Sequence, residues 1–290
     1  MKPDLQAHAI MIGKWLLTKG VSVYTSQQLY QAIREASRSF GDTHVRFGLR
    51  KTEDALVELN ILQRVTLRSD GYRDIERLAV LELHPTALHL AVSLRSDSYL
   101  CHLSAVYLHG LTDQIPSTSY VNKEQSPKQP SSGNLTQAAI DRAFSGSQRK
   151  SKYEFRLGKE RVVLLSGKNT KRLGVQTDTR TGLDVTDLER TLIDIAVRPR
   201  YSGGVFQVSR AYQTAAKEVD IAKLAWVLGM MSYKYPYHQS VGFYLSHAGL
   251  PESELQPFRL IDMEFDFYLD YSIANPVYNE SWRVFHPQGV

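Results

Sequence analysis

The stretch I-L-Q-R-V-T-L-R-S-D-G-Y-R-D-I-E-R-L-A-V, residues 61–80, decides the fold of the amino-terminal part of the chain. Two runs of alternating polar and apolar side chains flank the sequence S-D-G at 69–71. Gly71 can adopt the positive φ that a tight turn requires, so the stretch predicts a β-hairpin. Arg68 and Arg73 flank the turn, which makes the predicted tip basic.

Three helices are predicted before this hairpin. The first ends at Gly20, and Thr25 or Ser26 caps the second. Apolar side chains at the i, i+3, i+4, i+7 spacing predict that the second helix has a buried face. That face consists of Leu29, Ala32, Ile33 and Ala36.

The third helix is predicted to begin after Gly41, with Asp42 or Thr43 as its cap. Phe47 falls on the polar side of this helix, which fits either a later helix start or a contact that the sequence does not identify. The predicted buried stripe consists of Val45, Leu49, Thr52, Leu56 and Leu59.

Three helices followed by a basic hairpin are typical of a winged helix-turn-helix domain, which we predict for residues 1–83. In that arrangement the third helix enters the DNA major groove and the hairpin reaches phosphates beside it. For Arg46 and Arg50, a solvated helix face with Glu53 and Asp54 as ion-pair partners is the alternative. Arg50 is the candidate for a bidentate contact with a guanine edge. The candidate DNA-binding residues are Thr43, His44, Arg46, Arg50, Lys51, Arg68 and Arg73.

Residues 84–290 predict a larger, mixed α+β domain, because helices and strands do not alternate as they do in a doubly wound sheet. A loop is expected at 116–134, where three prolines disfavour regular structure. A short helix and a basic hairpin turned at Gly158-Lys159 follow it. Three further helices are predicted, at 205–216, 221–231 and 237–248.

The net charge of +5 is unevenly distributed. Residues 122–172 hold twelve Lys and Arg against four acidic residues, whereas residues 249–290 hold two against seven. A basic middle and an acidic end indicate a polyanionic partner or docking of the two segments on each other. A candidate second nucleic-acid surface consists of Arg149, Lys150, Lys152, Arg156, Lys159 and Arg161.

The composition excludes several classes of protein. A chain with 42% hydrophobic and 22% charged residues is globular rather than disordered. No apolar run approaches the roughly 20 residues of a spanning helix, and the start of the chain has no signal-peptide layout. One cysteine, Cys101, permits neither an internal disulfide nor a cysteine-based metal cluster. These features predict a cytoplasmic protein without membrane contact.

The motif V-T-D-L-E-R-T-L-I-D, which concentrates charged side chains, has two interpretations. Thr186 and Glu189 stand at the spacing of a capping box, and Asp187 lies in the first turn, where the helix dipole favours a negative charge. Arg190 and Asp194 are i, i+4 neighbours that can pair. A capped helix start therefore explains the motif better than a catalytic carboxylate cluster does.

The acidic stretch I-D-M-E-F-D-F supports an alternative function. A strand would place Asp262, Glu264 and Asp266 on one face, where they can hold Mg²⁺ in a metal-dependent phosphotransferase or nuclease. A solvated strand face is the structural alternative. His102 and His109 form a possible metal or acid–base pair, but no third ligand accompanies them. No nucleophile motif occurs, so we predict neither an enzyme nor a bound metal or cofactor.

The chain resembles the AbiEi-family antitoxins of bacterial type IV toxin–antitoxin systems. The resemblance begins with the winged-helix pattern and S-Y-L-C-H-L-S-A-V-Y-L-H-G-L-T-D-Q-I-P at 98–116. It continues with V-T-D-L-E-R-T-L-I-D-I-A at 185–196 and Y-S-G-G-V at 201–205. It ends with F-D-F-Y-L-D-Y through N-P-V-Y-N-E-S-W-R-V-F-H-P at 265–287.

This resemblance implies a protein that binds inverted repeats in its own promoter and represses its operon. The sequence leaves open whether it binds DNA as a dimer. The resemblance also implies a role in phage defence, in which the carboxy-terminal part counteracts a nucleotidyltransferase-like toxin without a stable complex. A stand-alone transcriptional regulator without a toxin is the alternative. The family signature, which we interpret as structural, consists of Asp187, Glu189, Arg190, Gly203 and Gly204.

Overall fold

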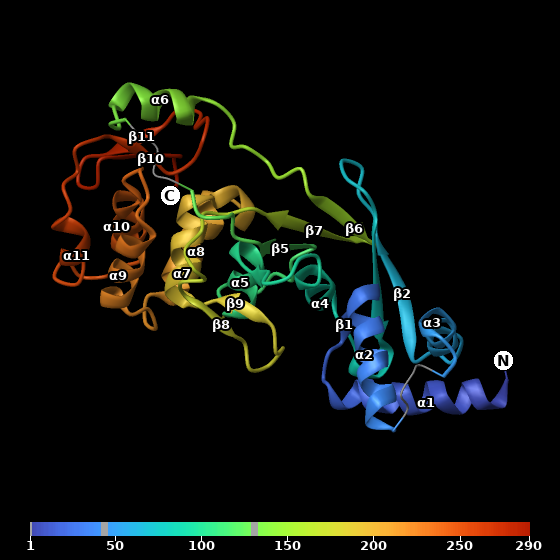
Figure 1. Cartoon of the computed structure of the whole chain (residues 1–290). Helices are drawn as coiled ribbons and strands as arrows, with labels where there is room; N and C mark the ends of the chain where they lie inside the picture. Colours follow the sequence, from blue (N-terminus) through green and yellow to red (C-terminus); the bar gives the residue numbers. More distant parts are fainter. Residues whose placement is uncertain (1, 42–45, 129–132) are drawn as a thin grey trace. The chain divides into compact units, whose positions relative to one another are not determined.

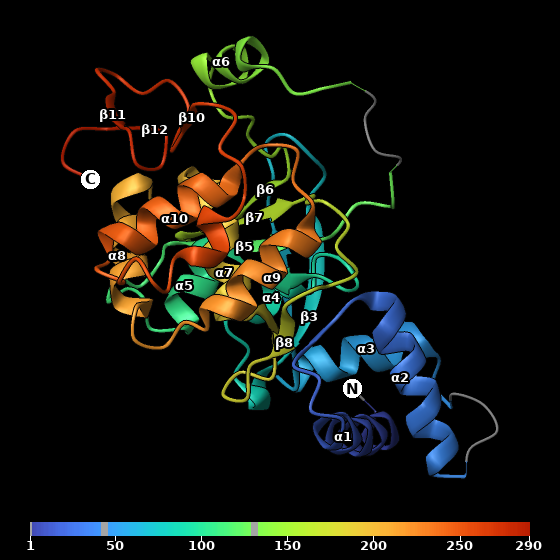
Figure 2. The ribbon, with the colours of Figure 1, turned by 90° about the vertical axis from the view of Figure 1, so that its left-hand side faces the viewer.

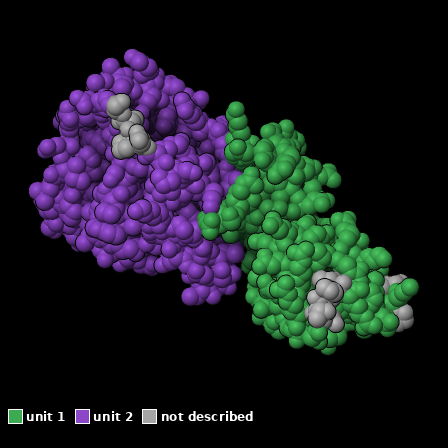
Figure 3. Space-filling view, viewed as in Figure 1, with its two compact units in different colours: residues 1–98, 152–163 green, residues 99–151, 164–290 purple. Residues whose placement is uncertain are grey.

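The computed structural model describes residues 2–41, 46–128 and 133–290. Helices and strands are mixed along the chain, as expected for an α+β protein. The chain divides into two compact units, which Figure 3 colours green and purple. Unit 1 comprises residues 1–98 and 152–163, and unit 2 comprises residues 99–151 and 164–290.

Unit 1 contains the three helices and the hairpin predicted for the start of the chain (Figure 1). The positive φ expected at Gly71 was wrong, because the strands pair only up to Leu67 and Ile75 and leave a longer loop that does not require it. Its sheet has the strand order β1-β3-β2, and both pairings are antiparallel. The 3₁₀ turn η1 (Leu81–Leu83) and the helix α4 (Ala87–Val92) follow the sheet. The elements are α1 (Pro3–Thr18), β1 (Val23–Tyr24), α2 (Ser26–Ser39), α3 (Leu49–Glu58), β2 (Leu62–Leu67) and β3 (Ile75–Val80).

The helix α2 begins and packs as its sequence predicts. The Thr25 hydroxyl accepts a hydrogen bond from the Gln28 backbone N–H at 3.1 Å, and the Gln28 side chain accepts one from the Thr25 N–H at 2.9 Å. This capping box satisfies two backbone donors that have no partner within the helix. The apolar stripe predicted for this helix is buried in the core of unit 1.

Unit 1 also takes in a hairpin from the middle of the chain. It consists of β6 (Glu154–Leu157) and β7 (Glu160–Leu165), whose last two residues belong to unit 2. Gly158 has a φ of +59° at the turn, a backbone conformation that glycine adopts without steric penalty. The basic hairpin predicted here is therefore present.

Unit 2 contains the strands β4 (Tyr99–Leu100), β5 (Thr118–Asn122), β8 (Val175–Thr177) and β9 (Asp184–Thr186). They are hydrogen-bonded in the order β5-β4-β9-β8, with β4 and β9 parallel. The prediction of a loop across 116–134 was wrong at β5. Four of the five β5 residues are buried, so pairing with β4 and burial outweigh the prolines, which lie outside the strand.

The large core of unit 2 lies among four helices, which Figure 2 shows gathered together. They are α7 (Leu188–Val197), α8 (Val205–Ala215), α9 (Ile221–Met231) and α10 (Tyr237–His247). The helices predicted at 205–216, 221–231 and 237–248 are present as α8, α9 and α10. None of the helices in the described residues is both long and apolar enough to cross a membrane.

Shorter elements complete unit 2. A small sheet of order β10-β12-β11 lies near the carboxyl terminus, and α6 has Thr136 as its cap. The predicted short helix after Asn134 or Thr136 is therefore α6. The elements are α5 (His102–Leu108), α6 (Gln137–Ser145), η2 (Pro199–Ser202), α11 (Gln256–Arg259), β10 (Phe267–Tyr268), β11 (Val277–Asn279) and β12 (Val284–His286).

Two helical glycines in unit 2 allow a matched test of packing. A Cβ atom at Gly242 in α10 would lie 2.2 Å from the ring of Trp282, whose side chain is fully buried. A Cβ atom at Gly229 in α9 would meet no atom within 4 Å.

We expect Gly242→Ala to lower the free energy of unfolding by ~1–3 kcal/mol, because the buried indole cannot move aside without strain. Gly229→Ala is expected to raise it by ~0.5–1 kcal/mol, because alanine is the better helix former. Urea denaturation of both variants measures the difference. Equal stabilities would contradict the close approach of α10 to Trp282.

Candidate nucleic-acid interface

The third helix begins later than the sequence predicted. It starts at Leu49, after Gly48, whose φ of +81° lies outside the helical region. Arg46 is exposed but precedes the helix, so its placement on the helix was wrong. Phe47 also precedes the helix, and its ring packs edge-on against the His8 ring at 5.4 Å. That contact and the later start together explain why Phe47 did not fit the predicted stripe.

Of the predicted stripe, Thr52 and Leu56 are buried, and Leu49 and Leu59 pack against the core of unit 1. Four of the residues predicted for this helix and its cap lie outside the described residues: Asp42, Thr43, His44 and Val45.

The exposed side of α3 carries Arg50 and Lys51. The Arg50 side chain is 71% exposed and lies 3.6 Å from a carboxylate oxygen of Asp54 and 3.9 Å from one of Glu53. Arg64 on β2 lies closer to the same two carboxylates, at 2.6 Å from Glu53 and 2.7 Å from Asp54. Glu53 and Asp54, the ion-pair partners that the sequence suggested for Arg50, therefore do lie beside it. An ion pair this exposed contributes little to stability, so Arg50 can exchange Asp54 for another anion.

The tip of the β2–β3 hairpin pairs with β6. The Arg68 N–H donates to the Arg156 carbonyl at 3.0 Å, and the Arg156 N–H donates to the Arg68 carbonyl at 2.7 Å. The Ser69 hydroxyl donates to the Glu154 carbonyl at 2.7 Å, and Arg156 forms an ion pair with Asp70. Because these partners are more than 80 residues apart in the chain, no local pattern could have revealed the pairing.

This pairing creates a row of three arginines, one directly after β2, one on β6 and one on β7, which we call the arginine row. Arg156 lies directly opposite Arg68 on one side and Arg161 on the other. Residues directly opposite each other in a ladder project from the same face of the sheet, and all three arginines are exposed. The opposite face is apolar and buried, as Leu67 and Phe155 show. Like charges opposite each other destabilise a sheet, so the row favours an anionic partner.

The other predicted basic residues divide between the units. Arg73, Lys152 and Lys159 are exposed in unit 1, together with the arginine row. Arg149 and Lys150 are exposed in unit 2. The two basic surfaces that the sequence suggested as separate thus meet, in part, where the β2–β3 hairpin pairs with β6 in unit 1.

The charged motif at the start of α7 is a helix cap, but its cap is not the residue that the sequence indicated. Asp187 is the cap, and its carboxylate accepts a hydrogen bond from the Arg190 N–H at 2.8 Å. Thr186 instead belongs to β9, with its hydroxyl 2.7 Å from that of Thr191. The strand pairing of β9 extends the chain through Thr186 and moves the cap one residue later.

Two signature carboxylates share a lysine that the sequence analysis missed. The Lys223 ammonium lies 3.0 Å from Asp187 and 2.7 Å from Glu189. Burial lowers the pKa of Lys223, but the hydrogen bonds and charges of these carboxylates raise it more, so the net shift is upward. Glu189 also accepts the Asp220 N–H at 3.1 Å. These contacts tie α7 to α9, which supports the structural interpretation of the motif.

Arg190 and Asp194 form a buried ion pair. Their side chains are 4% and 8% exposed, and the Arg190 Nε lies 2.9 Å from an Asp194 oxygen. The guanidinium also donates to the Leu173 carbonyl at 2.7 Å and the Thr170 hydroxyl at 3.0 Å. Burial lowers the pKa of Arg190, but the charge of Asp194 raises it above its ordinary value. The pair therefore links α7 to the loop before β8, which supports a structural role for these two residues.

The signature glycines act through the backbone. Gly203 has a φ of +85° and Gly204 a φ of +89°, both unfavourable for other residues. They reverse the chain between η2 and α8.

The acidic stretch near the carboxyl terminus does not form the predicted strand. Residues 261–266 are irregular, and β10 begins only at Phe267. Asp266 accepts hydrogen bonds from the Tyr278 hydroxyl at 2.7 Å and the Arg283 Nε at 2.9 Å. Burial raises the pKa of Asp266, but these two partners lower it more, so the net shift is downward. Contacts with the last strands, rather than an alternating pattern, thus set the backbone here.

The metal alternative loses its geometric basis with that strand. Across residues 2–41, 46–128 and 133–290, no three His, Cys, Asp or Glu side chains are grouped to hold a metal ion, and Asp262, Glu264 and Asp266 are no exception. His109 contacts the Thr186 carbonyl through Nε2 at 2.7 Å. His102 is buried, and its burial lowers its pKa to about 4.

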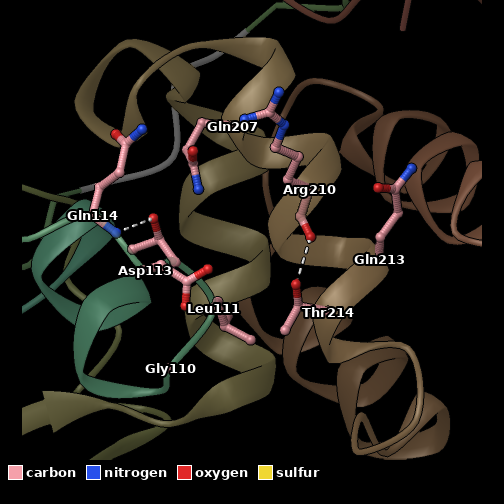
Figure 4. A pocket seen from close by; sticks show the side chains of 9 residues that line it. Gly110, Leu111, Asp113, Gln114, Gln207, Arg210, Gln213 and Thr214 are labelled. Atoms are coloured by element: carbon pink, nitrogen blue, oxygen red, sulfur yellow. Dashed lines mark hydrogen bonds between the residues drawn. The ribbon is translucent and has the colours of Figure 1, made fainter.

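A polar groove of about 490 Å³ lies between the loop after α5 and helix α8 in unit 2. Figure 4 shows Gln207 and Arg210 on α8 across from Asp113 and Gln114 on the loop. One cation and one carboxylate line the groove, so it has no charge surplus.

These features describe an α+β protein with a cationic sheet face in unit 1 and a tightly ion-paired helical core in unit 2. Residues 99–237 match the model of the AbiEi antitoxin C-terminal domain. Residues 99–237 therefore form an AbiEi antitoxin C-terminal domain, and the resemblance to AbiEi-family antitoxins seen in the sequence is confirmed.

The structure is also similar to a crystal structure of the RV2827C protein from Mycobacterium tuberculosis, with a TM-score of 0.57 and 16% sequence identity. The similarity covers 97% of this chain and 91% of the other, and at this identity it concerns the fold alone. A comparison with curated proteins found no match. The AbiEi domain supports an antitoxin role in a toxin–antitoxin system.

Proposed function

We propose that this chain is a non-enzymatic, cytoplasmic DNA-binding antitoxin that represses its own operon. Residues 1–83 act as a winged helix-turn-helix domain on inverted repeats in the promoter, and residues 84–290 act as the antitoxin domain. The antitoxin domain counteracts a nucleotidyltransferase-like toxin without a stable complex, in phage defence. The AbiEi match at 99–237 supports the antitoxin part.

The arrangement of unit 1 supports the repressor part. The order helix, strand, helix, helix, strand, strand with a β1-β3-β2 sheet is the one that winged-helix proteins use. In this proposal α3 enters the major groove and the β2–β3 hairpin is the wing. A dimer then places two α3 helices on the two halves of an inverted repeat.

The arginine row is the observation that supports DNA binding most directly. Three guanidinium groups on one sheet face repel each other, and Asp70 forms an ion pair with one of them, Arg156. DNA phosphates supply the missing negative charge, and arginine donates to phosphate in bidentate geometry. We therefore propose phosphate contacts along the row, extended by Arg73, Lys152 and Lys159, with Arg149 and Lys150 as further candidates.

The contacts of α3 and Arg46 with DNA bases are tested on a DNA fragment that contains the promoter of this chain's own operon. Changing Arg46, Arg50 and Lys51 to alanine is expected to weaken operator binding at least ~100-fold, because each lost bidentate or charged contact is worth ~1–3 kcal/mol. A gel-shift titration at fixed salt measures the dissociation constant, and circular dichroism verifies the fold. The same change at exposed Arg210 in unit 2 is the control. An unaltered affinity of the triple variant would remove α3 from the interface.

The phosphate-binding part is tested through salt dependence. Changing Arg68, Arg156 and Arg161 to glutamine is expected to lower the slope of log K against log salt by about one per lost contact. Binding weakens uniformly across DNA sequences, because phosphate contacts carry no base information. Arg210→Gln is again the control. A slope that matches the parent's would show that the row faces no phosphate.

The antitoxin part has its own test. If an adjacent reading frame encodes a nucleotidyltransferase, its expression should arrest growth, and co-expression of this chain should restore growth. Restoration by a variant defective in DNA binding separates toxin antagonism from repression. Without such a neighbour, or without restoration, the chain is a stand-alone regulator.

A further inference from the structure

Unit 2 contains two adjoining cavities that the proposed function does not use. The inner cavity has a volume of about 80 Å³, and the outer cavity has about 750 Å³. Lys168, Arg198 and Tyr233 line both, so the cavities share a wall. Lys234 and Tyr235 also line the outer cavity.

The shared wall has a surplus of positive charge. Within the described part of the chain, the Arg198 guanidinium makes no hydrogen bond or ion pair, and no carboxylate lies within 4 Å of the Lys168 ammonium. Lys168 donates to the Met231 and Ser232 carbonyls at 2.6 Å, which leaves one of its three N–H groups. The acid that lines the inner cavity, Asp194, is already neutralised by Arg190 at 2.9 Å.

His102 adds a buried polar group to the inner cavity. It is 7% exposed, and its Nδ1 has no hydrogen-bond partner among the described residues. Its φ of +50° is uncommon for a residue other than glycine, and such strained residues cluster at ligand sites. Burial lowers its pKa to about 4, so at neutral pH the ring is uncharged and has one donor and one acceptor nitrogen.

We propose that these cavities bind a small ligand that carries a phosphate group. The phosphate lies in the inner cavity between Lys168 and Arg198, and the rest of the ligand lies in the outer cavity against Tyr233 and Tyr235. Arginine recognises tetrahedral oxyanions by paired donors, and lysine adds a point charge. The site is separate from the arginine row and from the proposed repression.

The sizes of the two cavities support this division. The inner cavity equals roughly two to three water volumes of about 30 Å³ each, which suits one oxyanion rather than a whole ligand. The outer volume falls within the ~300–1,000 Å³ typical of small-molecule sites, and two tyrosines line it. The groove beside Arg210 has a useful volume but no charge surplus, and it serves as the comparison.

Isothermal titration calorimetry of the full chain at constant ionic strength tests the proposal with three probes. Inorganic phosphate and adenosine monophosphate are expected to bind, whereas uncharged adenosine is not. Tighter binding of the monophosphate identifies a phosphate ester as the ligand, and equal binding identifies phosphate itself. Both outcomes support the site.

The decisive variant is Arg198→Gln, because this guanidinium holds no other part of the described structure together. It should weaken phosphate and monophosphate binding at least ~10-fold, roughly the effect of losing one charged hydrogen bond. Arg210→Gln should bind within twofold of the parent, and DNA affinity should be unaltered in both. Undetectable binding of both phosphate probes, equal affinity in Arg198→Gln, or adenosine binding as tight as the monophosphate would overturn the proposal.

Discussion

Replacing Arg190 with methionine is expected to lower the free energy of unfolding by ~3–5 kcal/mol. The substitution leaves Asp194 charged and 8% exposed, without the guanidinium that now lies 2.9 Å away. It also removes the donors to Thr170 and Leu173, which link the loop before β8 to α7. A buried charge without its partner is among the most destabilising single changes in a protein. Urea denaturation followed by circular dichroism measures the loss.

Two further variants separate burial of the charge from loss of packing. Arg210→Met makes the same substitution at an exposed site on α8 and should change stability by no more than ~0.5 kcal/mol. Combining Arg190→Met with Asp194→Leu should recover part of the loss, because no unpaired charge remains. A loss below about 1 kcal/mol in Arg190→Met would mean that water reaches Asp194.

Stability is expected to fall as the pH drops from 6.5 towards 4, because two histidines are buried in their neutral form. Burial lowers the pKa of His102 and of His238 to about 4, from an ordinary value of 6.5. Between these values the unfolded chain binds protons that the native chain does not, so acid favours unfolding. Each histidine therefore contributes stability that is complete above pH 6.5, and about 3 kcal/mol of it is lost by pH 4.

The experiment compares denaturation midpoints at pH 7 and pH 5, above the range in which most carboxylates titrate. His102→Asn should remove about half of the pH dependence due to these two histidines. Asparagine is the replacement because it tolerates the left-handed backbone that His102 adopts. His84→Asn is the matched control, because His84 also has a positive φ but is exposed. Identical stability of the parent at both pH values would rule out neutral burial of these rings.

Much of unit 1 could be predicted from local patterns. The cap at Thr25, the buried stripe of α2 and the hairpin around Gly71 depend on residues within one or two turns of each other. The start of α3 was misplaced, because Gly48 allows helical and left-handed backbone alike and the sequence does not choose between them. Arg46 was assigned to the helix for that reason.

The candidate interface was predictable as a set of residues but not as a surface. Sequence patterns singled out Arg68 and Arg156 independently, because each stands near a turn in a basic hairpin. Their position as neighbours depends on backbone hydrogen bonds between segments more than 80 residues apart, which no periodicity records. The same holds for Lys223, which bridges Asp187 and Glu189 from another helix.

The sequence by itself determined where most helices and turns form, the antitoxin family of residues 99–237, and which side chains carry charge. The tertiary structure decided which of those charges are buried, which meet, and which stay exposed to a partner. Arg190 and Arg156 are the same residue type, yet one is 4% exposed and the other 60%. The cause is solvation: the energy of a charge depends on the water and counter-charges around it, and only packing between distant segments sets both.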